Sequence, residues 1–167
     1  MLKSKRNKPT ILAVSHCLFN PKVRANRLSQ HPGIKDKILK LGKKYNAKIE
    51  QLPCPEFLFL GEREPKTYDE YIEIPGFKNS CEKLAEDFIS NLGYINECHL
   101  IVVGIARSPS CSISYVYDKN NNLKKGDGMF IHCLRKKKSD NIIFLEIDYH
   151  QIDISIEKIK AVLGTTF

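Results

Sequence analysis

The 167-residue sequence lacks a long apolar run, a low-complexity tract and an internal repeat of fixed period. Its basic start, MLKSKRNKP, is followed closely by only four apolar residues, ILAV, which is too short for a signal-peptide core or a membrane span. We therefore expect a cytoplasmic protein with no membrane partner. Residues 1–9 are expected to form a basic tail and residues 10–167 a single domain, which is long enough for its own hydrophobic core.

The six cysteines include no C-x-x-C pair, which is the spacing typical of structural zinc sites. In a reducing compartment, cysteines serve as metal ligands, catalytic groups or small buried residues more often than as disulfides. Cys81 and Cys133 fall among apolar residues of expected helices and are expected in the core. Cys98 precedes an expected strand and has no assigned role.

Basic residues outnumber acidic ones, 27 to 19, which gives a formal net charge of +8. The lysines are spread along the chain, so a solvated lysine-rich surface accounts for most of this excess. The functional alternative is attraction to a phosphate-bearing partner such as a nucleotide or RNA. The sequence has no stacking-aromatic motif of a known RNA-binding domain.

Apolar runs of strand length alternate with helical patterns along the chain. Strands are expected at residues 10–17, 47–53, 99–106 and 141–149, and helices at 31–45, from 67, at 77–93, 129–138 and 155–164. A hairpin or an extended excursion, with turn residues in its middle, is expected between residues 113 and 128. This alternation predicts an α/β, three-layer Rossmann-like domain with a mostly parallel sheet flanked by helices.

Three of the strand-like runs end on a cysteine: Cys17 in SHCLFNP, Cys54 in LPCPEF and Cys111 in SPSCSIS. The loops that follow parallel strands share one edge of the sheet, and ligands bind along that edge. These cysteines are therefore expected to converge in space although they are far apart in sequence. Any one of them alone would be interpreted as a small buried residue, but the set favours a shared site.

Three thiolates fit an iron–sulfur cluster better than a structural zinc ion, which would need a fourth ligand such as His16 or His132. A four-iron cluster normally has one thiolate per iron, so three cysteines leave one iron open. An open iron is a Lewis acid that accepts a substrate atom, and a sulfur-bearing substrate suits it.

Polar residues near these cysteines are candidate catalytic groups. Glu56 follows Cys54 by two residues, so in an extended segment both side chains project to the same face, and its carboxylate would activate water or move a proton. Glu50 has the same parity but lies farther back along the strand. Ser108 and Ser110 would either bind a substrate oxygen or cap the turn at Pro109.

Taken in order, SHCL, PCPE and RSPSC resemble the three signature motifs of the thiouracil desulfurase (desulfidase) family. The stretch QLPCPEFLFLGEREP looks most similar to a shorter, desulfidase-related branch formerly of unknown function. The likeness runs from about Ile11 to Phe130. Two departures concern the substrate: Ser112 stands where many members have glycine, and FLFLGE replaces a paired glycine after CPE.

The resemblance implies an enzyme with a [4Fe-4S] cluster held by Cys17, Cys54 and Cys111. It implies non-redox removal of sulfur as hydrosulfide from a thiolated pyrimidine, with the sulfur bound to the open iron. Glu56 and Ser108 would be the assisting residues. The partner would be free thiouracil, a 4-thiouridine-type nucleobase or nucleotide, another small sulfur compound, or a thiolated tRNA.

Two other functional classes stay open at this point. One is a metal-free cysteine hydrolase or transferase with Cys111 or Cys17 as nucleophile, activated by His16 or a helix N-terminus. The other is a basic nucleotide- or RNA-binding module with a structural metal.

Overall fold

The computed structural model describes residues 8–28, 30–137 and 141–165. Its centre is a sheet of four strands in the order β2-β1-β3-β6, and every neighbouring pair is parallel. The strands are β1 (Thr10–Val14), β2 (Lys48–Gln51), β3 (His99–Ile105) and β6 (Ile142–Ile147). Most of the expected basic tail, residues 1–7, lies outside the described residues.

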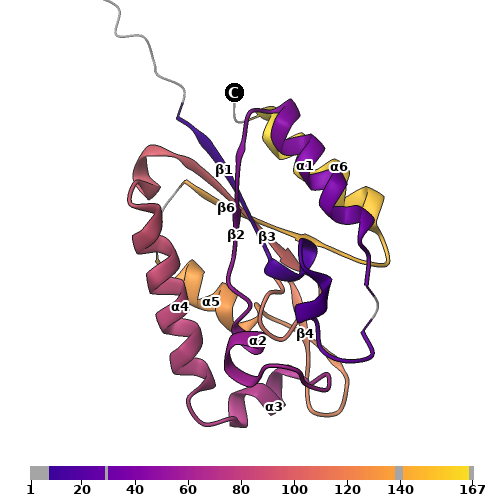
Figure 1. The fold of residues 1–167 in the computed structure, drawn as a ribbon. Coiled ribbons are helices and arrows are strands. Elements are labelled where there is room, and N and C mark those ends of the chain that lie inside the picture. The colour runs from indigo at the N-terminus through magenta and orange to yellow at the C-terminus, as the bar shows by residue number, and fades with distance from the viewer. Residues whose placement is uncertain (1–7, 29, 138–140, 166–167) are drawn as a thin grey trace, which may run out of the picture.

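Helices cover both faces of this sheet, which makes the three layers that the sequence predicts. Figure 1 shows α1 (Gly33–Lys44) and α6 (Ile152–Thr165) side by side on one face. On the other face lie α4 (Phe77–Leu92) and α5 (Met129–Arg135). The predicted α/β fold with a parallel sheet between helices is therefore confirmed.

The two central strands form the core because they are apolar on both faces. All five residues of β1 are buried, and so are Leu100 to Ile105 of β3. Parallel strands in the middle of a covered sheet require such continuous apolar runs. The strands β1 and β3 pair in register, with Leu12 opposite Ile101.

Local signals in the sequence explain several other elements. Thr67 and Glu70 form the reciprocal capping box at the start of α3 (Tyr68–Glu73), as expected. Helix α4 ends at Gly93, whose φ of 67° is left-handed. The expected hairpin is present as β4 (Tyr115–Tyr117) and β5 (Leu123–Lys125), which pair antiparallel.

One local prediction is wrong. The segment after Cys54 is the short helix α2 (Pro55–Leu60) rather than an extended chain. Pro55 occupies the first helical turn, where its missing N–H and fixed φ favour a helix start. The alternation of side chains in an extended chain therefore does not explain the position of Glu56, which lies in helix α2.

Three short 3-10 turns complete the described elements: η1 (His16–Leu18), η2 (Pro21–Val23) and η3 (Ile95–Glu97). Among the residues that the structure describes, no helix is both long and apolar enough to cross a membrane.

Candidate functional site

The three candidate cysteines lie in the loops that follow three neighbouring strands. Cys17 is in η1 after β1, Cys54 is the N-cap of α2 after β2, and Cys111 lies in the loop after β3. Burial is the main cause that raises the pKa of Cys111, and the neighbouring Cys54 and Cys17 raise it further. The predicted convergence at one sheet edge is therefore present.

The surroundings of these thiols favour their neutral form. Burial raises the pKa of Cys17 to about 12, although the residue keeps some exposed surface, and Arg24 lowers it in part. Burial also raises the pKa of Cys54, which the peptide N–H of Phe57 at the start of α2 partly offsets. At neutral pH the metal-free site therefore holds thiols rather than thiolates.

Within the described residues, no group of three or more His, Cys, Asp or Glu side chains is arranged to hold a single metal ion. A four-iron cluster needs a different arrangement of ligands. Each thiolate binds a different iron, so the thiolates are spread over the cluster and do not surround one ion. His132, which was considered as a fourth ligand, is exposed on α5, and His16 is half-exposed in η1.

The backbone of the loop that carries Cys111 packs directly against two glycines, Gly104 and Gly128. A Cβ atom at Gly104 would lie 1.9 Å from the carbonyl oxygen of Cys111. A Cβ atom at Gly128 would lie 2.3 Å from the carbonyl carbon of Ser110 and 2.6 Å from the backbone nitrogen of Cys111. Neither glycine has a left-handed φ, so the requirement for glycine is close approach of the backbones.

Ser108 has the capping position that the sequence analysis gave as one of its two roles. Its hydroxyl oxygen accepts hydrogen bonds from the backbone N–H groups of Ser110, at 3.3 Å, and of Cys111, at 3.0 Å. The Ser108 hydroxyl keeps its own proton available as a donor. Ser108 therefore orders the turn that carries Cys111.

Two buried hydroxyl groups flank Cys111. The side chains of Ser110 and Ser112 are fully buried, and neither hydroxyl oxygen has a hydrogen-bond partner within the described part of the chain. Buried hydroxyl groups normally have a hydrogen-bond partner, so two unpartnered ones, one on each side of Cys111, require an explanation. A sulfur-rich ligand at Cys111 would accept hydrogen bonds from these two hydroxyl groups.

Glu56 is held in a buried network with Arg63 and Tyr71. Its Oε2 accepts from Arg63 Nη2 at 2.7 Å and from the Tyr71 hydroxyl at 3.0 Å. Arg63 Nη1 also donates to the carbonyl oxygen of Val23, at 2.9 Å, in the segment that follows Cys17. This network ties the Cys17 loop to α2, and the Glu56 charge raises the pKa of both Cys17 and Cys111.

Replacing Tyr71 with phenylalanine should lower the free energy of unfolding by about 1.5–3 kcal/mol, the range for a hydrogen bond to a charged group. Tyr71 is fully buried, so water cannot replace the lost donor to Glu56. Urea unfolding of the variant and of the wild-type protein measures this difference. Tyr115→Phe, at a site that is 49% exposed, is the control and should change little. Equal losses in both variants would contradict the expected role of the network.

The strand β6 holds the other side of the Cys111 loop. Arg107, two residues after the end of β3, donates two hydrogen bonds to the Asp148 carboxylate, at 2.9 and 2.6 Å. The carboxylate Oε2 of Glu146 accepts from the backbone N–H of Ile113 at 2.7 Å. Both contacts join the chain around Cys111 to the end of β6, so the loop is fixed at both of its ends.

The Arg107–Asp148 pair predicts a pH dependence. The hydrogen bonds from Arg107 lower the pKa of Asp148 to about 2, from an ordinary value of 3.8. Because the folded-state pKa is the lower one, this contribution to stability is complete above about pH 4 and is lost as the pH falls towards about 2. The unfolding temperature of Asp148→Asn should therefore lie below that of the wild type at pH 6 and approach it near pH 2.

The control for this pH series is Asp153→Asn, because the side chain of Asp153 is 88% exposed in its pair with Lys37. This variant should change the unfolding temperature little at any pH. A difference between Asp148→Asn and wild type that stays constant from about pH 6 to pH 2 would contradict the assignment.

Arg24 and Tyr149 also belong to this site, and sequence reasoning missed both. Burial raises the pKa of Cys17, and Arg24 and Tyr149 are two groups that act in the opposite direction and lower it. Tyr149 comes two residues after the end of β6. The rule that strand-end loops meet at one edge, applied to the fourth strand as well, would have found it.

Glu50, the less favoured candidate, lies apart from the network around Glu56. It is on the edge strand β2 and forms an ion pair with Lys48 at 2.7 Å. The structure thus brings together Cys17, Cys54, Cys111 and Glu56, with Ser108 in the supporting turn.

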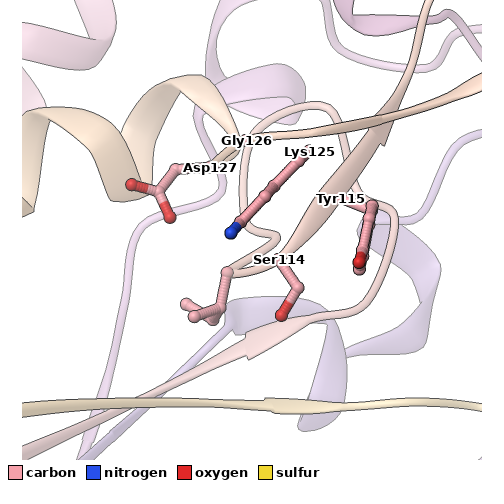
Figure 2. Close-up of a pocket in the computed structure, with 6 residues that line it drawn as sticks. Ser114, Tyr115, Lys125, Gly126 and Asp127 are labelled. Carbon is pink, nitrogen blue, oxygen red and sulfur yellow. The ribbon is translucent and has the colours of Figure 1, made fainter.

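An open pocket of about 430 Å³ continues from the Cys111 loop to the hairpin. It is lined by Ile113, Ser114, Tyr115, Lys125, Gly126 and Asp127. In Figure 2 the Lys125 side chain extends across this pocket between Asp127 and Tyr115. Ile113 is two residues from Cys111, so the pocket adjoins the loop that carries one of the three thiols.

No family model matches the sequence. Among solved structures, the fold is similar to that of the [4Fe-4S]-dependent thiouracil desulfidase TudS, with a TM-score of 0.54 and 15% sequence identity. The similarity covers 92% of this chain and 99% of that one. At this level of identity the comparison establishes a common fold.

A sequence relative gives the family. The uncharacterized protein MJ0003 of Methanocaldococcus jannaschii is 35% identical over 115 residues, which make up 67% of this chain and 70% of that protein. The chain therefore belongs to the same protein family as MJ0003.

Proposed function

We propose that the protein is a [4Fe-4S]-dependent desulfidase of the cytoplasm. Its substrate is a thiolated pyrimidine such as thiouracil or a 4-thiouridine-type nucleobase or nucleotide, and its products are hydrosulfide and the corresponding oxo compound. Water supplies the oxygen atom that replaces sulfur. The observation that supports this proposal best is the meeting of the Cys17, Cys54 and Cys111 thiols at the loop edge of a fold similar to that of TudS.

The residues present suit such a cluster. All three cysteines are free, and sulfur is the donor that iron–sulfur clusters require. The nearby carboxylate of Glu56 is already paired with Arg63, so the donor set that faces the ligand is sulfur alone. When bound, a four-iron cluster with three protein ligands supplies one iron as a Lewis acid for a substrate sulfur.

The chain's own polar groups have defined tasks in this proposal. Glu56, paired with Arg63, lies near the thiols and is the group that takes a proton from water. Only its Oε2 is used by Arg63 and Tyr71, which leaves Oε1 for that step. The Ser108 hydroxyl, anchored by the N–H of Cys111, donates its own proton to a substrate oxygen.

The metal-free cysteine enzyme is less well supported. A cysteine nucleophile acts as the thiolate, and its pKa is normally lowered by its surroundings. Here burial raises the pKa of Cys17 to about 12 and that of Cys111 well above its ordinary value. Neutral thiols are poor nucleophiles, so these surroundings do not favour a metal-free cysteine enzyme.

The experiment is anaerobic reconstitution with iron and sulfide, followed by iron analysis, a visible absorption spectrum and sulfide release from thiouracil, 4-thiouridine and thiolated tRNA. About four irons per chain with broad visible absorption, together with sulfide release, is the expected result. Turnover of tRNA without turnover of the free nucleobase would assign the macromolecular substrate. Folded protein that takes up no iron would overturn the proposal.

A further inference from the structure

The pocket beside the hairpin holds a lysine without an anionic partner. Within the described residues Lys125 forms no ion pair, whereas the adjacent Lys124 is paired with Asp69. Asp127 lines the same pocket, but its carboxylate accepts a hydrogen bond from Arg135 Nε at 2.8 Å. The pocket therefore carries one positive charge that no described carboxylate neutralises, which favours an anionic ligand.

The arginine that neutralises Asp127 is itself held in place. The guanidinium carbon of Arg135 lies 4.3 Å from the centroid of the Phe144 ring, which belongs to β6. An arginine fixed between an aromatic ring and a carboxylate keeps that carboxylate paired. Asp127 therefore does not compete with an incoming anion for the Lys125 ammonium group, which Figure 2 shows extending across the pocket.

The other walls suit a nucleotide better than a bare ion. The volume of about 430 Å³ lies in the range of small-molecule sites, roughly 300–1,000 Å³. The Tyr115 ring is 49% exposed and offers a flat surface for a sugar or a base, and Ser114 adds a hydroxyl that both donates and accepts. Gly126 leaves room, because an added Cβ there would meet nothing within 4 Å.

The pocket lies next to the Cys111 loop along two hydrogen-bonded segments. The N–H of Gly128 donates to the carbonyl oxygen of Ser112, and the N–H of Gly126 donates to that of Ser114, both at 2.9 Å. Ser112 directly follows Cys111, and the second contact is at the pocket wall. The two contacts are two residues apart, which is about 6–7 Å of extended chain. A pyrimidine whose sulfur lies at the thiols can therefore extend its sugar and phosphate into this pocket.

We propose that this pocket is a phosphate subsite, in which Lys125 binds a phosphate group of the substrate and Tyr115 packs against the attached sugar. The inference rests on the proposed function and deepens it, because it selects a nucleotide unit over the free nucleobase. A free mononucleotide and a nucleotide within RNA carry the same phosphate chemistry, so the test includes both.

The test compares kcat/KM for sulfide release by the reconstituted protein from 4-thiouridine 5′-monophosphate and from 4-thiouridine. A charge-assisted contact to the phosphate should make the monophosphate the better substrate by about 10–100-fold. Lys125→Gln should lower kcat/KM for the monophosphate to about that of the nucleoside, chiefly by raising KM, and should leave the nucleoside value unchanged. Lys125→Arg retains the charge and should recover part of the preference.

A second variant and a control separate the pocket from the general positive charge of the protein. Gly126→Leu fills the open space of the pocket without removing a charge, and it should abolish the preference as Lys125→Gln does. Lys158→Gln removes a positive charge from an exposed position on α6, outside the pocket, and should match the wild type with both substrates.

A short RNA that contains one 4-thiouridine assigns the source of the phosphate. If kcat/KM for the RNA exceeds that for the monophosphate and falls in Lys125→Gln, the phosphate belongs to RNA. If the monophosphate has the higher Lys125-dependent value, the substrate is a free nucleotide.

Equal kcat/KM for the monophosphate and the nucleoside in the wild type would overturn this inference and leave the desulfidase proposal intact. So would a preference that both Lys125→Gln and Gly126→Leu retain. Binding of uridine 5′-monophosphate and of uridine, which contain no sulfur, separates the two proposals. Tighter binding of the monophosphate that Lys125→Gln removes, in a protein that holds its cluster but releases no sulfide, would overturn the proposed function and leave the phosphate subsite standing.

Discussion

Replacing Cys111 with alanine should abolish sulfide release and leave the reconstituted protein without a stable four-iron cluster. Three thiolates are already one fewer than a four-iron cluster normally has, so a site with two cannot hold it. Iron analysis and sulfide release after anaerobic reconstitution measure the effect. Cys17→Ala and Cys54→Ala should give the same result, because the proposed cluster needs all three thiolates.

The matched control is Cys98→Ala. Cys98 is fully buried, as Cys111 nearly is, but it precedes the amino end of β3, where its thiol contacts the carbonyl oxygen of Ile95 at 3.6 Å. This variant should keep its iron and its activity. If any one of the three site variants retained both cluster and sulfide release while folded, that cysteine would not be a ligand.

Replacing Gly104 with alanine should displace the Cys111 loop, remove the cluster and lower the free energy of unfolding by at least about 3 kcal/mol, the upper end of the usual range for overpacking. The added methyl group would meet the Cys111 carbonyl oxygen at 1.9 Å, and that atom belongs to the backbone. A backbone fixed by Ser108 and by β6 cannot move aside as a flexible side chain does. Urea unfolding and iron content measure the two effects.

The comparison for this variant is Gly33→Ala at the first position of α1, where an added Cβ meets nothing within 4 Å. Alanine favours a helix over glycine, so this variant should be unchanged or slightly stabilised. Gly128→Ala, which would press on the same loop from its other side, should behave like Gly104→Ala. Normal iron content in both site variants would mean that the loop is not held as the structure describes.

The sequence was sufficient to predict that the three cysteines follow neighbouring strands of one parallel sheet. Apolar runs predict β1, β2 and β3, and parallel strands place their following loops at one edge. Cys17, Cys54 and Cys111 each follow one of these strands, so their meeting depends only on strand direction and order. No contact between individual side chains had to be known.

The contacts around the three cysteines were harder to predict from the sequence. Glu56 reaches the site because α2 begins at Pro55 and Arg63 holds the carboxylate, whereas the sequence analysis assumed an extended chain. Pro55 favours the first turn of a helix, a preference that the prediction of an extended chain leaves out of account. A helix of six residues has too few apolar positions for its period to be recognised.

Partners that come from distant segments were missed for a different reason. Arg63 donates hydrogen bonds to the carbonyl oxygen of Val23 and to the carboxylate of Glu56. Tyr149, far from Cys17 in the sequence, is one of the groups that lower the pKa of Cys17. Such contacts are determined by packing between loops, and no short-range pattern records them. Tyr149 is the exception, since its position after β6 is itself a strand-end signal.

The strand order has a consequence for biosynthesis. The strand β1, made first, lies between β2 and β3 and pairs with β3 so that Thr10 is opposite His99. A nascent chain that has emerged only as far as Cys54 can form the β1–β2 pair, but Cys111 follows β3 and has not yet joined it. Contacts between such distant segments form late in folding. Assembly of the proposed cluster would therefore be a late step in the maturation of this protein, and the thiols of Cys17 and Cys54 would have to stay reduced until Cys111 joins them.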